Sequence, residues 1–108
     1  MKIDDAAARL EALGNPTRLQ IYRALMRAGE AGMPVGKLQA KLDIAASTLS
    51  HHVKSLLTVG LIVQERQSTT LICRANYDVM QGLVDFLVAE CSCTQAVCTP
   101  SQNKGRAA

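Results

Sequence analysis

The chain has 108 residues, of which 48% are apolar and only 3% aromatic, and its net charge is +3. This length fits one small domain with an aliphatic core, a composition that favours helices. No apolar run is long enough to span a bilayer, and the start "MKIDDAAARLEALG" lacks the continuous apolar stretch of a signal peptide. We therefore expect a cytoplasmic protein without a membrane partner.

The first thirty residues predict two helices. Apolar residues at helical spacing indicate one over residues 3–13, which Gly14 ends. Asn15 is a favourable N-cap for the second helix, Pro16 suits its first position, and Gly29 marks its end. The inward stripe of this second helix is expected to be Leu19, Tyr22, Leu25 and Met26.

The middle of the chain predicts a helix-turn-helix followed by a β-hairpin. After a turn at "EAGMPV", a short helix from about Val35 to Leu42 is followed by a break at Asp43. The longer helix "IAASTLSHHVKSLLTVG" then runs to Gly60. Two runs rich in β-branched residues in "LIVQERQSTTLICRA" predict a hairpin with a longer loop, its polar tip at residues 66–69.

The last predicted helix runs from Tyr77 to about Glu90 and is apolar on more than one face. Such a helix needs cover on both sides, most simply from the same helix of a second subunit. We therefore expect residues 1–90 to form a winged-helix DNA-binding and dimerisation domain, mainly α with a β-hairpin wing in the order α-α-α-α-β-β-α. Residues 91–108 are expected to be a cysteine-containing ligand-binding segment with a flexible, polar tail.

The longer helix of the helix-turn-helix carries polar and basic side chains opposite its apolar face. No acidic residue occurs from Ser47 to Val59. Hydroxyl, imidazole and ammonium groups donate to phosphate oxygens and base edges, whereas a carboxylate would repel DNA. An ordinary solvated face is the alternative interpretation. With Arg66 at the hairpin tip, the predicted DNA contacts are Ser47, Thr48, Ser50, His51, His52, Lys54 and Arg66.

Three stretches resemble the ArsR/SmtB family of bacterial metalloregulators: "LEALGNPTRLQIYRAL", "STLSHHVKSLLTVGLI" and "VQERQSTTLICRAN". They occur in the family's order and cover roughly residues 5–90. The resemblance implies a homodimeric repressor that binds a palindromic operator and leaves it when an inducer binds. The resemblance does not identify the inducer, because members of the family bind their ligands at several different places. Here the start of the helix-turn-helix lacks cysteine, and the last helix lacks the histidines of zinc sensors.

The segment "ECSCTQAVC" resembles the cysteine clusters that some arsenic-responsive members carry after the last helix, although a serine separates its first two cysteines. Cys91, Cys93 and Cys98 provide three thiols for one trivalent arsenic, which forms a three-coordinate thiolate complex, and soft thiolates suit this soft centre. The same residue set also suits antimonite or, with two sulfurs, methylated arsenic. We expect arsenite as the inducer.

Other interpretations of the cysteines remain open. Zinc or cadmium prefers four ligands, for which Cys73 is a candidate, although its strand position favours a small core residue. Two tail thiols forming a disulfide would make a redox switch instead. An enzyme is not expected, since the chain has no Gly-rich phosphate loop and no paired carboxylates on one face. A metal buffer that never touches DNA would not need "STLSHHVKSL".

Overall fold

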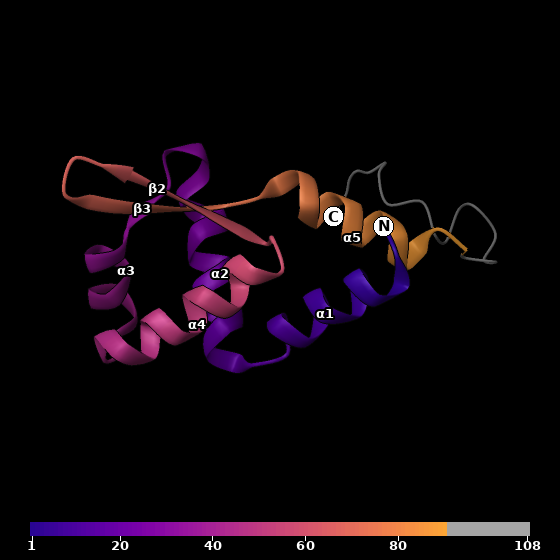
Figure 1. Cartoon of the computed structure of the whole chain (residues 1–108), viewed down its shortest axis with the longest axis horizontal. Helices are drawn as coiled ribbons and strands as arrows, with labels where there is room; N and C mark the ends of the chain where they lie inside the picture. The colour runs from indigo at the N-terminus through magenta and orange to yellow at the C-terminus, as the bar shows by residue number, and fades with distance from the viewer. Residues whose placement is uncertain (91–108) are drawn as a thin grey trace.

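The structure, a computed structural model, describes residues 1–90 and has five α-helices and three short strands in that range (Figure 1). The helices are α1 (Ile3–Leu13), α2 (Pro16–Ala28), α3 (Val35–Leu42), α4 (Ala46–Thr58) and α5 (Tyr77–Val88). A 3₁₀ turn, η1 (Gly29–Ala31), precedes β1 (Met33–Pro34), and the hairpin consists of β2 (Ile62–Gln67) and β3 (Thr70–Ala75). The predicted winged helix-turn-helix is confirmed.

Local signals place the ends of α2. The side-chain oxygen of Asn15 accepts hydrogen bonds from the backbone amides of Thr17 and Arg18, at 2.9 and 3.1 Å. Two of the amide groups that lack a partner inside the helix are thereby satisfied, as expected of an N-cap. At the other end Gly29 adopts φ 71°, which an L side chain rarely does. Both predicted boundaries are confirmed.

The sheet differs from the prediction in two ways. Its order is β1-β3-β2, all antiparallel, so the segment predicted as a plain turn contributes a strand whose Met33 lies opposite Cys73. The hairpin loop is also shorter than predicted: Gln67 pairs with Thr70, which leaves only Ser68 and Thr69 between the strands. Ser68 has φ 60°, the left-handed conformation that allows such a tight turn. The prediction of a longer loop was therefore wrong, and Arg66 belongs to β2.

One aliphatic core joins α2, α3, α4 and the sheet, and its fully buried members include Ile21, Leu25, Leu38, Leu49 and Leu61. The predicted inward stripe of α2 is only half right. Tyr22 and Leu25 are buried, but Leu19 and Met26 are exposed, and Ile21 and Ala24 take their places. The α2 helix contacts α1, α3, α4 and β3, so its buried face is wider and rotated relative to the predicted stripe.

The pair α1 and α5 packs together at the end of the molecule away from the wing (Figure 1). Leu83 of α5 faces inward and is buried, whereas Val84, Leu87 and Val88 are exposed. Ile3 and Leu10 of α1 are exposed as well. Within one chain the apolar α5 therefore keeps an uncovered face, as the sequence predicted.

Candidate nucleic-acid interface

The α4 helix has one buried and one exposed face. Leu49, Val53 and Leu56 are buried in the core. A left-handed Asp43 ends α3 and turns the chain sharply toward α4, with Ile44 packed against the core. The polar residues predicted to contact DNA on this helix are exposed, namely Ser47, Thr48, Ser50, His51 and Lys54. The structure thus places five of the seven predicted residues on the exposed face of α4.

His52 differs from these five because it is half-buried and turned toward the protein. Burial lowers its pKa below the ordinary 6.5, and the nearby charges of Arg18 and His51 lower it further. Its Nδ1 is buried without a hydrogen-bond partner among residues 1–90. A neutral, half-buried imidazole is a weaker candidate for a phosphate contact than its neighbours on α4.

Arg66 lies in β2 opposite Leu71 and is exposed. The base of the wing is fixed by Arg74, which forms an ion pair with Glu65 across the hairpin and whose Nε donates to the carbonyl of Glu30 at 2.8 Å. The wing and the amino-terminal half of α4 both lie toward the end of the molecule away from α5 (Figure 1). The wing is therefore anchored to η1 while its tip remains free to meet a partner.

The cysteines divide into two groups. Cys73 is fully buried in β3, as predicted for a core residue, and burial raises the pKa of its thiol, although Gln64 Nε2 donates to Sγ at 3.4 Å and opposes that rise. Cys91, Cys93 and Cys98 lie outside the described residues. In the range 1–90 no three His, Cys, Asp or Glu side chains gather in a way that would hold a metal ion. A protonated, enclosed Cys73 is poorly placed to serve as a fourth ligand.

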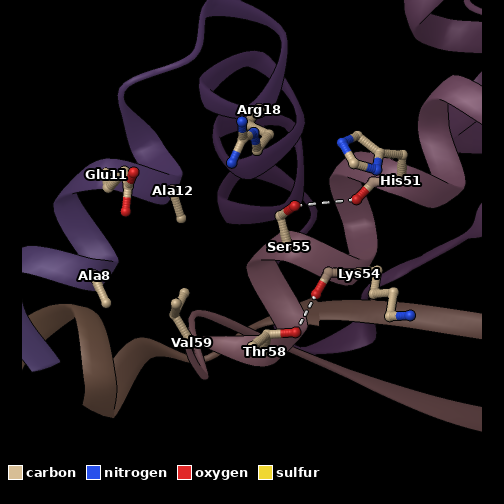
Figure 2. A pocket seen from close by; sticks show the side chains of 9 residues that line it. All are labelled: Ala8, Glu11, Ala12, Arg18, His51, Lys54, Ser55, Thr58 and Val59. Atoms are coloured by element: carbon tan, nitrogen blue, oxygen red, sulfur yellow. Dashed lines mark hydrogen bonds between the residues drawn. The ribbon is translucent and has the colours of Figure 1, made fainter.

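A groove of about 550 Å³ runs between α1, the start of α2 and the outer face of α4 (Figure 2). Polar residues along it include Glu11, Arg18, His51, Lys54, Ser55 and Thr58. Sequence reasoning assigned no role to Arg18, although it stands in the "NPTR" stretch. Its contribution depends on how α1 and α4 cross, which no local pattern specifies.

The carboxyl end of α4 is also tied to α1. Arg9 Nε donates to the backbone carbonyl of Val59 at 2.9 Å, close to the last turn of α4. A cation is favourable there because the carbonyl groups at a helix's carboxyl end carry partial negative charge. The helix that packs against α5 is thus bonded directly to the helix that carries the predicted DNA contacts.

Comparison with known proteins agrees with this architecture. A family model described as a helix-turn-helix domain matches residues 13–65. The biofilm growth-associated repressor of Agrobacterium fabrum is 31% identical over 99 residues, which span 92% of this chain and 77% of that protein. A winged helix-turn-helix domain from Mycobacterium bovis, described as homodimeric and as a possible ArsR-family regulator, superposes with a TM-score of 0.67. It is 26% identical and covers 81% of this chain and 79% of its own.

The chain belongs to the ArsR family of winged-helix transcriptional regulators. The resemblance noted in the sequence is thereby confirmed at the level of the family, and the relatives are regulators rather than enzymes. The direction of regulation differs among these relatives. HlyU of Vibrio cholerae, 27% identical over 76% of this chain and 73% of its own, is described as a transcriptional activator. No helix among residues 1–90 of this ArsR-family chain has the length and apolarity needed to cross a membrane.

Proposed function

We propose that this protein is a repressor that binds operator DNA as a homodimer and releases it when trivalent arsenic, or antimony, binds Cys91, Cys93 and Cys98. The observation that carries the proposal is the spacing of these three thiols, which fall within eight positions directly after α5. In this proposal residues 91–108 are the ligand-binding segment and residues 1–90 the DNA-binding and dimerisation domain.

The chemistry of the cluster favours a three-coordinate centre. Arsenous acid exchanges its three hydroxyl groups for thiols, releasing three waters, and the resulting pyramid needs no fourth ligand. Zinc and cadmium prefer four. Cys73, the remaining cysteine of the chain, is buried in the central strand β3 and has a raised thiol pKa, which supports the three-thiol ligand over a four-thiol one.

The exposed apolar faces of α1 and α5 support the homodimer. Val84, Leu87 and Val88 of α5, with Ile3 and Leu10 of α1, lie on helices that pack together at one end of the chain. A dimer of this kind would place two α4 helices about one DNA turn apart, matching two half-sites. Sedimentation equilibrium should give a dimer for the wild type and for Val63→Glu in the wing, but a monomer for Leu87→Glu. A dimeric Leu87→Glu variant would contradict this surface.

Coupling between ligand and DNA would run through α1. An atom bound to the three sulfurs would join the cysteines just beyond α5, α5 packs on α1, and Arg9 of α1 holds the carboxyl end of α4. A small change in the angle between the subunits would prevent the two α4 helices from matching both half-sites. The ligand must bind the DNA-incompetent arrangement more tightly, since equal affinity for both arrangements would shift nothing.

The test follows arsenite binding and DNA release in the same protein. Native mass spectrometry of the reduced protein should show one arsenic per subunit with loss of three protons, abolished by Cys91→Ser. Fluorescence anisotropy on DNA from upstream of the protein's own gene should show release by arsenite in the wild type and in Cys73→Ala, but not in Cys93→Ser. Cys73→Ala is the matched control because it removes a thiol without touching the cluster.

The outcomes separate the alternatives. Release by arsenite that is unaffected by Cys93→Ser would refute the role of that residue. Tight binding of zinc or cadmium, together with no binding of arsenite, would make this a zinc- or cadmium-responsive regulator. Release by a thiol oxidant but not by any metal would make it a redox-responsive one.

A further inference from the structure

The groove between α1 and α4 is continuous with the exposed face of α4. His51 and Lys54, both among the predicted DNA contacts, line it together with Ser55 and Thr58 one turn further along. In Figure 2 the side chain of Arg18 lies between Glu11 on one side and His51 and Ser55 on the other. The groove therefore adjoins the face of α4 that is predicted to contact DNA.

Arg18 enters the groove from a fixed backbone. Its own amide is one of the two that Asn15 caps, so the first turn of α2, from which the side chain projects, is held in place. Within residues 1–90 Arg18 forms no ion pair, and its buried Nε has no hydrogen-bond partner. A guanidinium group carries five donors that match the oxygens of a phosphate. Because Nε is enclosed by the protein, a phosphate in the groove would meet the two terminal nitrogens of the guanidinium group.

The two hydroxyl groups of the groove are already engaged, and its lysine points elsewhere. Ser55 Oγ donates to the carbonyl of His51 at 3.2 Å, and Thr58 Oγ1 donates to that of Lys54 at 2.8 Å. The ammonium group of Lys54 extends away from the centre of the groove in Figure 2, toward a different part of the helix's outer face. Arg18 is thus the arginine that lines the groove, and Glu11 on α1 is the acidic residue of the same lining.

We infer that this groove binds a phosphodiester group of the DNA backbone, with Arg18 as its principal donor. The contact would be independent of sequence and would fix how α4 is oriented on the duplex, since phosphate contacts set register whereas base contacts specify sequence. Glu11 opposes the phosphate charge and limits the affinity. The inference rests on the proposed DNA binding and adds to it a residue outside α4 and the wing.

Binding of the reduced, full-length protein to a fluorescent duplex of random sequence, measured by anisotropy over a range of salt concentrations, tests this site. Losing one phosphate contact lowers the slope of log affinity against log salt by about 0.9 per subunit. Arg18→Gln should show that drop and weaken binding about tenfold at low salt, and Arg18→Lys should recover part of both. Glu11→Gln should bind more tightly than the wild type. Far-UV circular dichroism melting curves establish that each variant is folded.

Arg23→Gln is the matched control. Arg23 lies on the same helix and is exposed, but it lines a different groove with Arg27 and Lys41, so its loss removes the same charge elsewhere. Equal slopes for Arg18→Gln and Arg23→Gln would overturn the inference, as would weaker binding by Glu11→Gln. A wild type without salt-dependent DNA binding would instead refute the proposed function itself.

A second experiment distinguishes binding of a phosphate in the DNA backbone from binding of free inorganic phosphate. Inorganic phosphate should displace the duplex no better than sodium chloride at equal ionic strength, for the wild type and for Arg18→Gln alike. Displacement by phosphate well beyond that of chloride, lost in Arg18→Gln, would mean that the groove takes a free anion and would overturn the assignment to the DNA backbone.

Discussion

Gly32 should be the least replaceable glycine in the amino-terminal half of the molecule. It adopts φ 72° and ψ −166°, a conformation almost restricted to glycine, where β1 approaches β3. A Cβ built on it would lie 2.5 Å from the carbonyl oxygen of Cys73 and 2.9 Å from Cγ2 of Ile72. Both neighbours belong to the central strand of the sheet and are not free to move.

Gly29 provides a control with almost the same backbone. Its φ and ψ are 71° and −156°, and a Cβ there would meet nothing within 4 Å. Gly29→Ala should therefore cost only the conformational strain, about 1–3 kcal/mol of unfolding free energy. Gly32→Ala adds steric overlap worth about 1–3 kcal/mol more. Its total of about 2–6 kcal/mol is a large share of the 5–15 kcal/mol that stabilises a typical domain.

Urea unfolding followed by far-UV circular dichroism measures both variants. All samples need one protein concentration, because the stability of a dimer depends on it. The gain from restricting the unfolded chain is the same for both Gly→Ala changes and cancels in the comparison. If Gly32→Ala were within about 0.5 kcal/mol of Gly29→Ala, the close approach of β1 to β3 would not hold in solution.

Three further changes test other contacts. Asn15→Ala should lower the unfolding free energy by about 1 kcal/mol because two amides lose their acceptor, whereas Asn15→Asp should keep it; unchanged urea midpoints for both would refute the cap. Arg9→Met should lower the unfolding free energy by about 0.5–1.5 kcal/mol and speed backbone amide hydrogen exchange in the last turn of α4. The control Arg23→Met should leave that exchange unchanged. The lowered pKa of His52 means that the unfolded chain takes up its proton first as pH falls below 6.5. Stability is therefore complete above that pH and declines between 6.5 and the lower folded pKa. His52→Asn should reduce the fall in melting temperature from neutral to mildly acid pH, and an undiminished fall would show that other groups cause it.

Much of the helical framework was predictable because its signals are local. Asn15 and Gly29 delimit α2 through their own hydrogen bonding and backbone conformation. The apolar spacing of α4 places Leu49, Val53, Leu56 and Leu57 on one side, and all but the half-buried Leu57 are buried. The strand alternation that placed Cys73 in the core was equally local. For the same reason the five polar residues on the outer face of α4 were found exposed as expected.

Features that depend on distant neighbours were missed. The strand β1 has only two residues, too few to show a periodic pattern. Its pairing with β3 joins positions about forty residues apart, which local sequence does not indicate. The α2 helix carries apolar residues on several sides, and only its packing against α1, α3, α4 and β3 decides that Ile21 rather than Leu19 is buried. The groove that holds Arg18 likewise exists only because α1 crosses α4.

The order of strands in the sheet has a consequence for how the chain can be cut. The central strand β3 is the last of the three strands in the chain, and both β1 and β2 pair with it, so the sheet forms only after β3 has been synthesised. The segment 13–65 that carries the helix-turn-helix therefore ends before the strand that closes its sheet and contributes Cys73 and Ala75 to its core. A fragment ending there would leave the edge of β1 unpaired and part of the core in water. Chains truncated before residue 70 should consequently not compete for DNA with the complete protein, and transferring α4 to another scaffold would require transfer of the whole hairpin as well.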